Sequence, residues 1–317
     1  MKKLFLILLA SAALSCQKRL NVPEIDFTVT TGKQQIAVND TANFTFTGNA
    51  DFITFWSGET GRRYQFKERK EAEGDPVFSF RSKKFHAQAN TLAILVSTNF
   101  TGVTPNSITA TKSSIAAATW DDITTRTTLP SAANVLASSG NVSLKDYAVA
   151  GKPIYFAFKY TGVPVTSLNR WEIDSFILRN LLSDGTSYVI ANFNSQNSPF
   201  TNYGVTTINP GFVFYSTNNN LTWFNSTLNS QPGIVFRTEN TGLTANHEAW
   251  AIIGPINLRK VTPDVGVVIK GLSQNLKDLR FIYRYPAPGN YNAVFEAGKA
   301  NSEVQRYKSV DIPFTVK

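Results

Sequence analysis

Residues 151–160 have the sequence Gly-Lys-Pro-Ile-Tyr-Phe-Ala-Phe-Lys-Tyr. Large side chains alternate here, and Ile154, Phe156, Phe158 and Tyr160 lie on one side of an extended backbone. An apolar period of two is typical of a strand that buries one face. The period recurs along the chain, with turn residues at intervals of about ten positions. We therefore expect an all-β fold of antiparallel sandwiches in which helix is minor.

A second strand is expected at residues 171–176. Strict alternation would place Trp171 and Ile173 on the face opposite to Phe176.

The composition excludes several classes of protein. The chain has 317 residues and a formal charge of +9, from 31 Lys and Arg against 22 Asp and Glu. One Cys and two His exclude a disulfide scaffold, a Cys-rich zinc site and most His-dependent catalysis. The basic residues are dispersed, so the charge does not predict a nucleic-acid partner.

The first residues have the pattern of a secretory signal peptide. Basic Lys2 and Lys3 precede an apolar run, and small residues end it just before Cys16. Because a thiol can carry a lipid and Cys16 is the single Cys, we expect residues 1–15 to be removed and Cys16 to be lipidated. Residues 16–22 then form a tether. This predicts a protein attached to a membrane by lipid only.

The two ends of the mature chain resemble halves of one module. Residues 42–61 contain a strand, a Trp and a Gly-acidic-Gly turn, and residues 283–297 contain a Tyr, a Pro-Gly-x-Tyr turn and an alternating strand. Both resemble immunoglobulin-like polycystic-kidney-disease (PKD) repeats. The resemblance implies a discontinuous Ig/PKD-like β-sandwich of residues 23–70 and 279–317.

The intervening residues 71–278 are expected to form an inserted second domain. The order of the segments 92–102, 118–124, 139–147, 152–160 and 171–174 resembles jelly-roll choice-of-anchor and galactose-binding-like domains. Nearly the whole mature chain resembles the Bacteroidetes lipoproteins of domain of unknown function 5017. That resemblance implies an accessory lipoprotein of the starch-utilisation type, beside an outer-membrane importer and its glycan-binding lipoprotein. It also implies a lipid-anchored position in the outer membrane, at the cell surface or on the periplasmic side.

The segment 185–236 has an unusual composition. Its 52 residues include no Asp, Glu, Lys, Arg or His, but ten Asn and ten aromatic residues. One interpretation is a binding site for an uncharged polyol, because amides form hydrogen bonds with its hydroxyls and aromatic faces pack on its C–H groups. The alternative interpretation is structural: the Asn residues form turns between strands, and the aromatic rings fill the core. Under the first interpretation, Trp223 and Tyr215 flank one turn in adjacent strands and form an exposed platform. The other candidate ligand-binding residues are Tyr203, Phe224, Asn218 and Asn220.

Other candidate sites carry weaker signals. Asp121 and Asp122 could ligate a structural calcium ion, although neighbours on a strand point to opposite faces; no other cofactor is expected. Thr41, in Asp40-Thr41-Ala42, resembles an O-glycosylation acceptor. Glu172 and Asp174 share a strand face, so their carboxyl groups could lie close enough to act as the catalytic pair of a glycosidase.

The sequence contains no nucleophile motif, and His86 and His247 are expected at the surface. The leading hypothesis is therefore a non-catalytic surface lipoprotein that binds a polysaccharide or oligosaccharide. The alternatives are a structural or adhesive lipoprotein that binds another protein and, less favoured, a polysaccharide-active enzyme.

Overall fold

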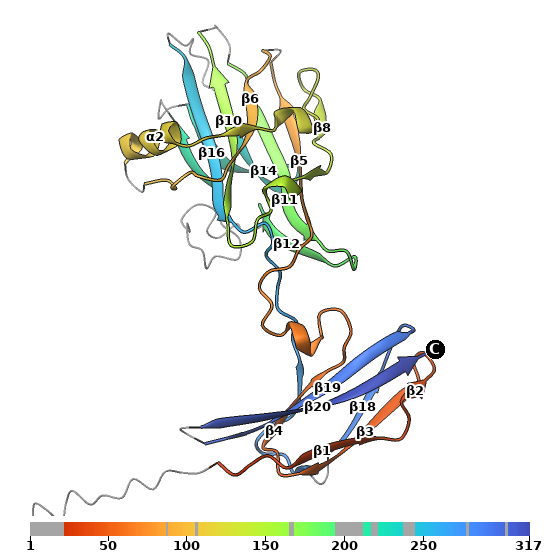
Figure 1. The fold of residues 1–317 in the computed structure, drawn as a ribbon. Helices are drawn as coiled ribbons and strands as arrows, with labels where there is room; N and C mark the ends of the chain where they lie inside the picture. Colours follow the sequence, from red (N-terminus) through yellow and green to blue (C-terminus); the bar gives the residue numbers. More distant parts are fainter. Residues whose placement is uncertain are drawn as a thin grey trace, which may run out of the picture. The chain divides into compact units, whose positions relative to one another are not determined.

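The computed structural model describes residues 22–86, 88–104, 107–164, 168–193, 212–216, 221–236, 245–276, 279–301 and 304–317. The fold is all-β, which confirms the fold class expected from the periodicity (Figure 1). The contacts divide the chain into two compact units, one of residues 1–68 and 263–317 and one of residues 69–262.

The first unit is a discontinuous Ig-like sandwich of two sheets. One has the order β1-β3-β18 and the other the order β17-β4-β19-β20-β2. The strands are β1 (Phe27–Thr31), β2 (Gln35–Ile36), β3 (Thr41–Gly48), β4 (Phe52–Trp56), β17 (Val267–Lys270), β18 (Arg280–Arg284), β19 (Gly289–Ala300) and β20 (Gln305–Val316).

Aromatic side chains fill the core of this first sandwich. Phe44 lies at its centre, with its ring centroid 4.8 Å from that of Phe295 and 5.5 Å from that of Phe314. The burial pattern of β3 alternates residue by residue, because one of its faces packs on this core.

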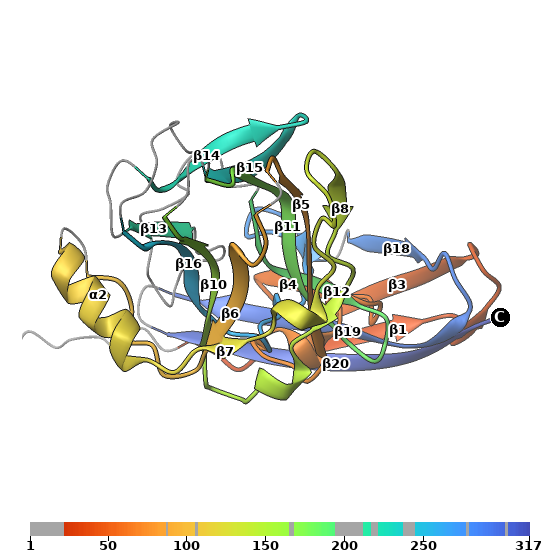
Figure 2. The ribbon, with the colours of Figure 1, turned by 90° about the horizontal axis from the view of Figure 1, so that it is seen from above.

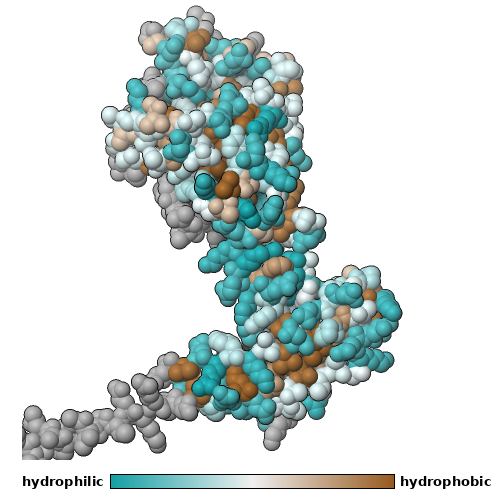
Figure 3. Space-filling view, viewed as in Figure 1, coloured by the Kyte–Doolittle hydropathy of each residue, from teal (hydrophilic) through white to brown (hydrophobic). Residues whose placement is uncertain are grey.

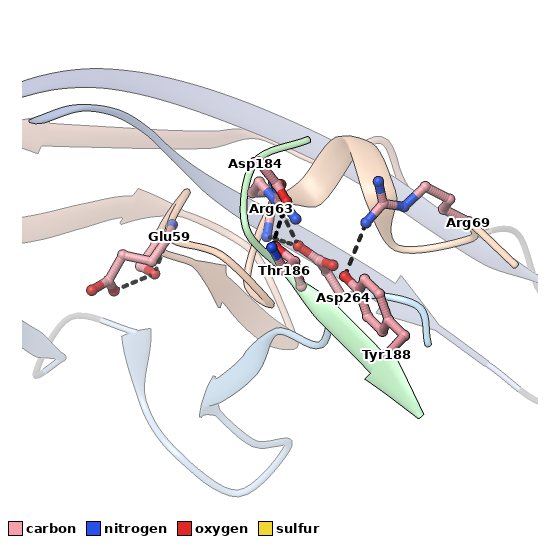
Figure 4. A network of polar contacts seen from close by, with 8 residues as sticks. Glu59, Arg63, Arg69, Asp184, Thr186, Tyr188 and Asp264 are labelled. Carbon is pink, nitrogen blue, oxygen red and sulfur yellow. Dashed lines mark hydrogen bonds and ion pairs between the residues drawn. The ribbon is translucent and has the colours of Figure 1, made fainter. Parts of the chain in front are cut away.

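The chain returns to the first unit earlier than residue 279, the boundary expected from the sequence. Strand β17 pairs with β4, with Val267 opposite Phe55. Just before β17, the Asp264 carboxylate is buried, and it accepts hydrogen bonds from the Arg63 backbone N–H at 2.9 Å and Arg63 Nε at 3.0 Å (Figure 4). These contacts hold residues 263–276 to the first unit, whereas the sequence-based boundary placed them in the second.

The second unit is also a sandwich of two antiparallel sheets. One has the order β13-β16-β10-β6-β7; the other has the order β14-β15-β11-β5-β8, with β12 paired to β11 and β9 to β5. Its strands are β5 (Asp75–Lys84), β6 (Leu92–Ser97), β7 (Asp121–Asp122), β8 (Leu136–Ser138), β9 (Val142–Ser143), β10 (Ile154–Gly162), β11 (Trp171–Leu181), β12 (Ser187–Asn192), β13 (Phe212–Ser216), β14 (Trp223–Leu228), β15 (Gln231–Phe236) and β16 (His247–Ile256).

The chain crosses between these two sheets repeatedly, as is typical of jelly-roll sandwiches. Their inner faces meet in one aromatic core. Phe78 and Phe80 of β5 contact Phe156 and Phe158 of β10, with centroid distances of 5.0 and 5.1 Å. The alternation of residues 151–160 therefore does mark a strand with one face in the core.

A β-bulge in β11 changes the alternation expected for residues 171–176. Ser175 has φ 54°, and the pairing of β11 with β5 shifts register between Asp174 and Ile177. The extra residue returns Phe176 to the inner face, where it is buried in the same core as Trp171.

The α-helix of the described residues is α2 (Ile108–Ala117), and short 3-10 turns occupy Tyr64–Phe66, Thr124–Arg126 and Lys145–Tyr147. The Ser107 hydroxyl caps α2 by accepting a hydrogen bond from the Ala110 N–H. In both ribbon views α2 lies beside the sheet that contains β10 and β16 (Figures 1 and 2).

The surface of each unit is mixed in hydropathy. On the face shown in Figure 3, hydrophobic residues form small patches among hydrophilic ones. Within the part of the chain that the structure describes, no helix has the length and apolar character needed to span a membrane.

Candidate functional site

The structure does not support Trp223 as an exposed platform. Trp223 is only 1% exposed, and its Nε1 donates a 3.1 Å hydrogen bond to the Ala249 carbonyl inside the core. Tyr215, its expected partner, is 6% exposed and lies in β13, which belongs to the other sheet. The two rings are not in adjacent strands, because the chain crosses the sandwich between β13 and β14.

Phe224 follows Trp223 in β14 and points away from the core. It is 37% exposed, on the outer face of the sheet formed by β14, β15, β11, β5 and β8. Tyr203, Asn218, Asn220 and Cys16 lie outside the described residues. Thr41 begins β3 and is half-buried.

Asp121 and Asp122 do not converge on one site. They form β7, so their side chains point to opposite faces. Burial and the nearby Asp121 carboxylate raise the pKa of Tyr147, whereas Asp122 lines a cavity on the outer face of the sheet. No group of three or more His, Cys, Asp or Glu side chains in the described ranges is placed to hold a metal ion.

That cavity, which we name the outer-sheet pocket, has a volume of about 560 Å³. Its aromatic walls are Trp120, Tyr215 and Trp250; its aliphatic walls are Ala93, Leu95, Ile115 and Ala116; and its polar walls are Lys112, Asp122, Lys159, Thr161 and Glu248. This volume lies within the range of small-ligand sites, and the walls combine apolar side chains with hydrogen-bonding groups.

Strand register builds the base of the pocket. Tyr215 of β13 pairs with Trp250 of β16, Trp250 pairs with Lys159 of β10, and Lys159 pairs with Ala93 of β6. Pairs directly opposite each other have side chains on the same face. These four residues therefore form one row across the outer face of the sheet.

A second aromatic layer comes from the segment that follows α2. The Trp120 centroid lies 5.1 Å from that of Trp250 and 5.2 Å from that of Phe100. Trp120 Nε1 donates to the Ile115 carbonyl of α2 at 3.2 Å. Trp120 is thus anchored on two sides, and it remains only half-buried.

The charged groups of the pocket are organised around Trp250. Lys159 Nζ lies 2.6 Å from Glu248 Oε1 and 4.9 Å from the Trp250 ring centroid. Trp250 Nε1 donates to Glu248 Oε2 at 3.3 Å. Burial, together with the charge of Glu248, raises the pKa of Tyr215, so its phenol is neutral and can donate or accept hydrogen bonds.

The carboxylates considered for glycosidase chemistry are held by arginines. Arg81 Nε lies 2.6 Å from Asp174 Oδ1, and Arg170 donates to Glu172. Asp174 is buried. Both groups therefore have the surroundings of structural ion pairs on the outer face of the other sheet.

His247 is buried, whereas the sequence predicted a surface position; His86 is exposed. His247 Nε2 lies 2.6 Å from the Leu221 carbonyl, to which it donates, and 3.4 Å from Ser216 Oγ. Because Nε2 carries the hydrogen that it donates to the Leu221 carbonyl, Nε2 cannot accept a hydrogen bond from the Ser216 hydroxyl in this tautomer.

The sequence analysis missed the outer-sheet pocket as a site. It considered Asp122 only as a calcium ligand and placed Tyr215 next to Trp223. The one local signal was the adjacency of Trp120 to Asp121 and Asp122. The other contributors come from segments that only strand register brings together.

The fold and the pocket define a two-unit β-sandwich protein with an aromatic cavity on the outer face of one sheet. The chain belongs to the family described as domain of unknown function (DUF5017), whose model matches residues 15–198. The matched range contains Trp120, Asp122 and Lys159, while Glu248 and Trp250 follow it. Searches of curated proteins and of solved structures gave no match.

Proposed function

We propose that this protein is a non-catalytic glycan-binding lipoprotein that holds its ligand in the outer-sheet pocket. The observation that carries the proposal is the half-buried indole of Trp120 at a cavity of about 560 Å³ that also contains carboxylate, ammonium and hydroxyl groups. An indole face packs on the C–H face of a sugar ring, and the polar groups can pair with its hydroxyls.

The proposed ligand is a polysaccharide or oligosaccharide. In the part of the chain that the structure describes, the glycosidase candidates Glu172 and Asp174 are engaged by arginines, which favours binding over catalysis. A lipid on Cys16 would hold many copies at one surface, and multiple weak contacts to one long glycan then add up to firm retention.

The N-terminal pattern supports the anchoring part of the proposal. A basic start, an apolar run and a single Cys at position 16 are the features of an exported lipoprotein. We further propose a Bacteroidetes origin, an outer-membrane location at the cell surface, and a role of the starch-utilisation type beside an importer and its glycan-binding lipoprotein.

Affinity electrophoresis of the purified protein through gels that contain neutral polysaccharides tests this function. Retardation by at least one polysaccharide, lost on addition of its soluble oligosaccharide, is the expected result. Unchanged mobility across the panel, together with capture of a membrane protein from native membranes, would favour the adhesive alternative instead.

A further inference from the structure

The outer-sheet pocket contains an ion pair, that of Lys159 and Glu248. Lys159 lies in β10 and Glu248 in β16, and Nζ and Oε1 are 2.6 Å apart. The ammonium also lies over the Trp250 ring, and the Trp250 N–H donates to the second carboxylate oxygen. A donor and an acceptor are therefore held side by side on one indole.

Both groups of this pair are partly exposed at the pocket. The side chain of Glu248 is 41% exposed and that of Lys159 is 23% exposed, and both line the pocket. An ammonium donates up to three hydrogen bonds, and a carboxylate accepts several. Adjacent hydroxyls of a sugar ring present the matching arrangement, because one can donate to the carboxylate while its neighbour accepts from the ammonium.

We infer that the Lys159–Glu248 pair is the specificity element of the pocket and selects uncharged sugars that carry two neighbouring hydroxyls. This inference rests on the proposed function and gives its ligand a chemical class.

The charge balance of the pocket supports an uncharged ligand. Among the described residues its charged walls are Lys112 and Lys159 against Asp122 and Glu248, so their formal charges sum to zero, 2 − 2. Lys159 is already neutralised by Glu248 at 2.6 Å. An acidic sugar would have to compete with Glu248 for this ammonium and would bring its own carboxylate close to two others.

Trp120 supplies the part of recognition that does not depend on charge. Its ring lines the same cavity, next to Trp250. A neutral and an acidic pyranose present similar C–H faces to an indole, so Trp120 would accept either. Selection between them is left to the Lys159–Glu248 pair.

Isothermal titration of the purified protein with maltohexaose, xylohexaose, mannohexaose and hexagalacturonate tests the inference. The variants are Glu248→Gln, Lys159→Met and Trp120→Ala, with Lys145→Met as a control because Lys145 is exposed and does not line the pocket. Circular dichroism and thermal unfolding establish that each variant is folded.

We expect the wild type to bind at least one neutral hexasaccharide more tightly than hexagalacturonate. Glu248→Gln should weaken that neutral ligand about tenfold and strengthen hexagalacturonate, because Lys159 is then uncompensated. Lys159→Met should weaken the neutral ligand without a gain for hexagalacturonate, and Lys145→Met should match the wild type.

Two failures are distinguishable. Wild type that binds none of the four probes would overturn both the proposed function and this inference. Two results would overturn the inference alone. One is binding of neutral hexasaccharides that is lost in Trp120→Ala but unchanged in Glu248→Gln and Lys159→Met. The other is a wild type that prefers hexagalacturonate.

Discussion

The indole rings of Trp120 and Trp250 lie 5.1 Å apart, centroid to centroid, with an angle of 53° between their planes. Trp120 precedes the short strand β7, and Trp250 lies within β16, so only the fold brings them together. Phe100 supports Trp120 at 5.2 Å. A ring fixed in this way loses little conformational entropy when a ligand packs on it.

Trp223 and Phe224 are neighbours in β14 that should respond to substitution in opposite ways. Trp223→Ala removes a buried indole and its bond to Ala249, so we expect the second unit to lose about 3–5 kcal/mol of unfolding free energy. Phe224→Ala should cost less than about 1 kcal/mol, because the ring is exposed. Urea unfolding followed by fluorescence measures both values. Equal costs would contradict the assigned strand faces.

Stability should fall in mildly acidic solution because of His247. Burial lowers the pKa of His247 from its ordinary value of 6.5, so the unfolded chain takes up this proton at a higher pH than the folded chain. The contribution of neutral His247 is complete above about pH 6.5 and is lost as the pH falls toward the lower, folded pKa.

The measurement is the unfolding midpoint from pH 8 to pH 5 for the wild type and His247→Gln. The wild type should lose more stability over this range than the variant, since Gln does not titrate. Parallel curves would show that His247 titrates alike in both states. His86→Gln, a change at an exposed histidine, serves as the control.

The ion pair of Arg81 and Asp174 should matter for stability and not for glycan binding. Arg81→Met leaves the buried Asp174 carboxylate without its guanidinium, and we expect a loss of about 2–4 kcal/mol. Replacing both partners, as Arg81→Met with Asp174→Leu, should recover much of that loss. Glycan binding that disappears in the folded double variant would move the site to this face of the second unit.

Cys16 should determine membrane attachment. In the native host, Cys16→Ser removes the thiol that would carry the lipid, so the protein should leave the membrane fraction and lose its acyl mass. Fractionation with immunoblotting and intact-protein mass spectrometry provide the measurement. Retention of the variant in the membrane fraction would argue against lipid anchoring.

The all-β class was predictable because alternation in segments such as residues 154–160 is a local property. Alternation assigns the wrong face to Phe176. The bulge at Ser175 returns Phe176 to the inner face of the sheet. Alternation specifies faces only while the pleat is regular, and nothing in the local composition marked this bulge.

The pocket was not predictable from sequence for a different reason. The row of Tyr215, Trp250, Lys159 and Ala93 depends on three strand registers that join residues far apart in the chain. The expected partnership of Tyr215 and Trp223 failed because a short connection was taken as a hairpin within one sheet, whereas the chain crosses to the other sheet.

Titration of one neutral hexasaccharide into the wild type, Trp120→Ala and Phe224→Ala tests the central claim most directly. Both variants remove an aromatic ring from the second unit, but only Trp120 lines the outer-sheet pocket. Affinity should fall by at least about tenfold in Trp120→Ala and stay within about twofold of the wild type in Phe224→Ala. Wild-type affinity in Trp120→Ala, with loss of binding in Phe224→Ala, would contradict the claim.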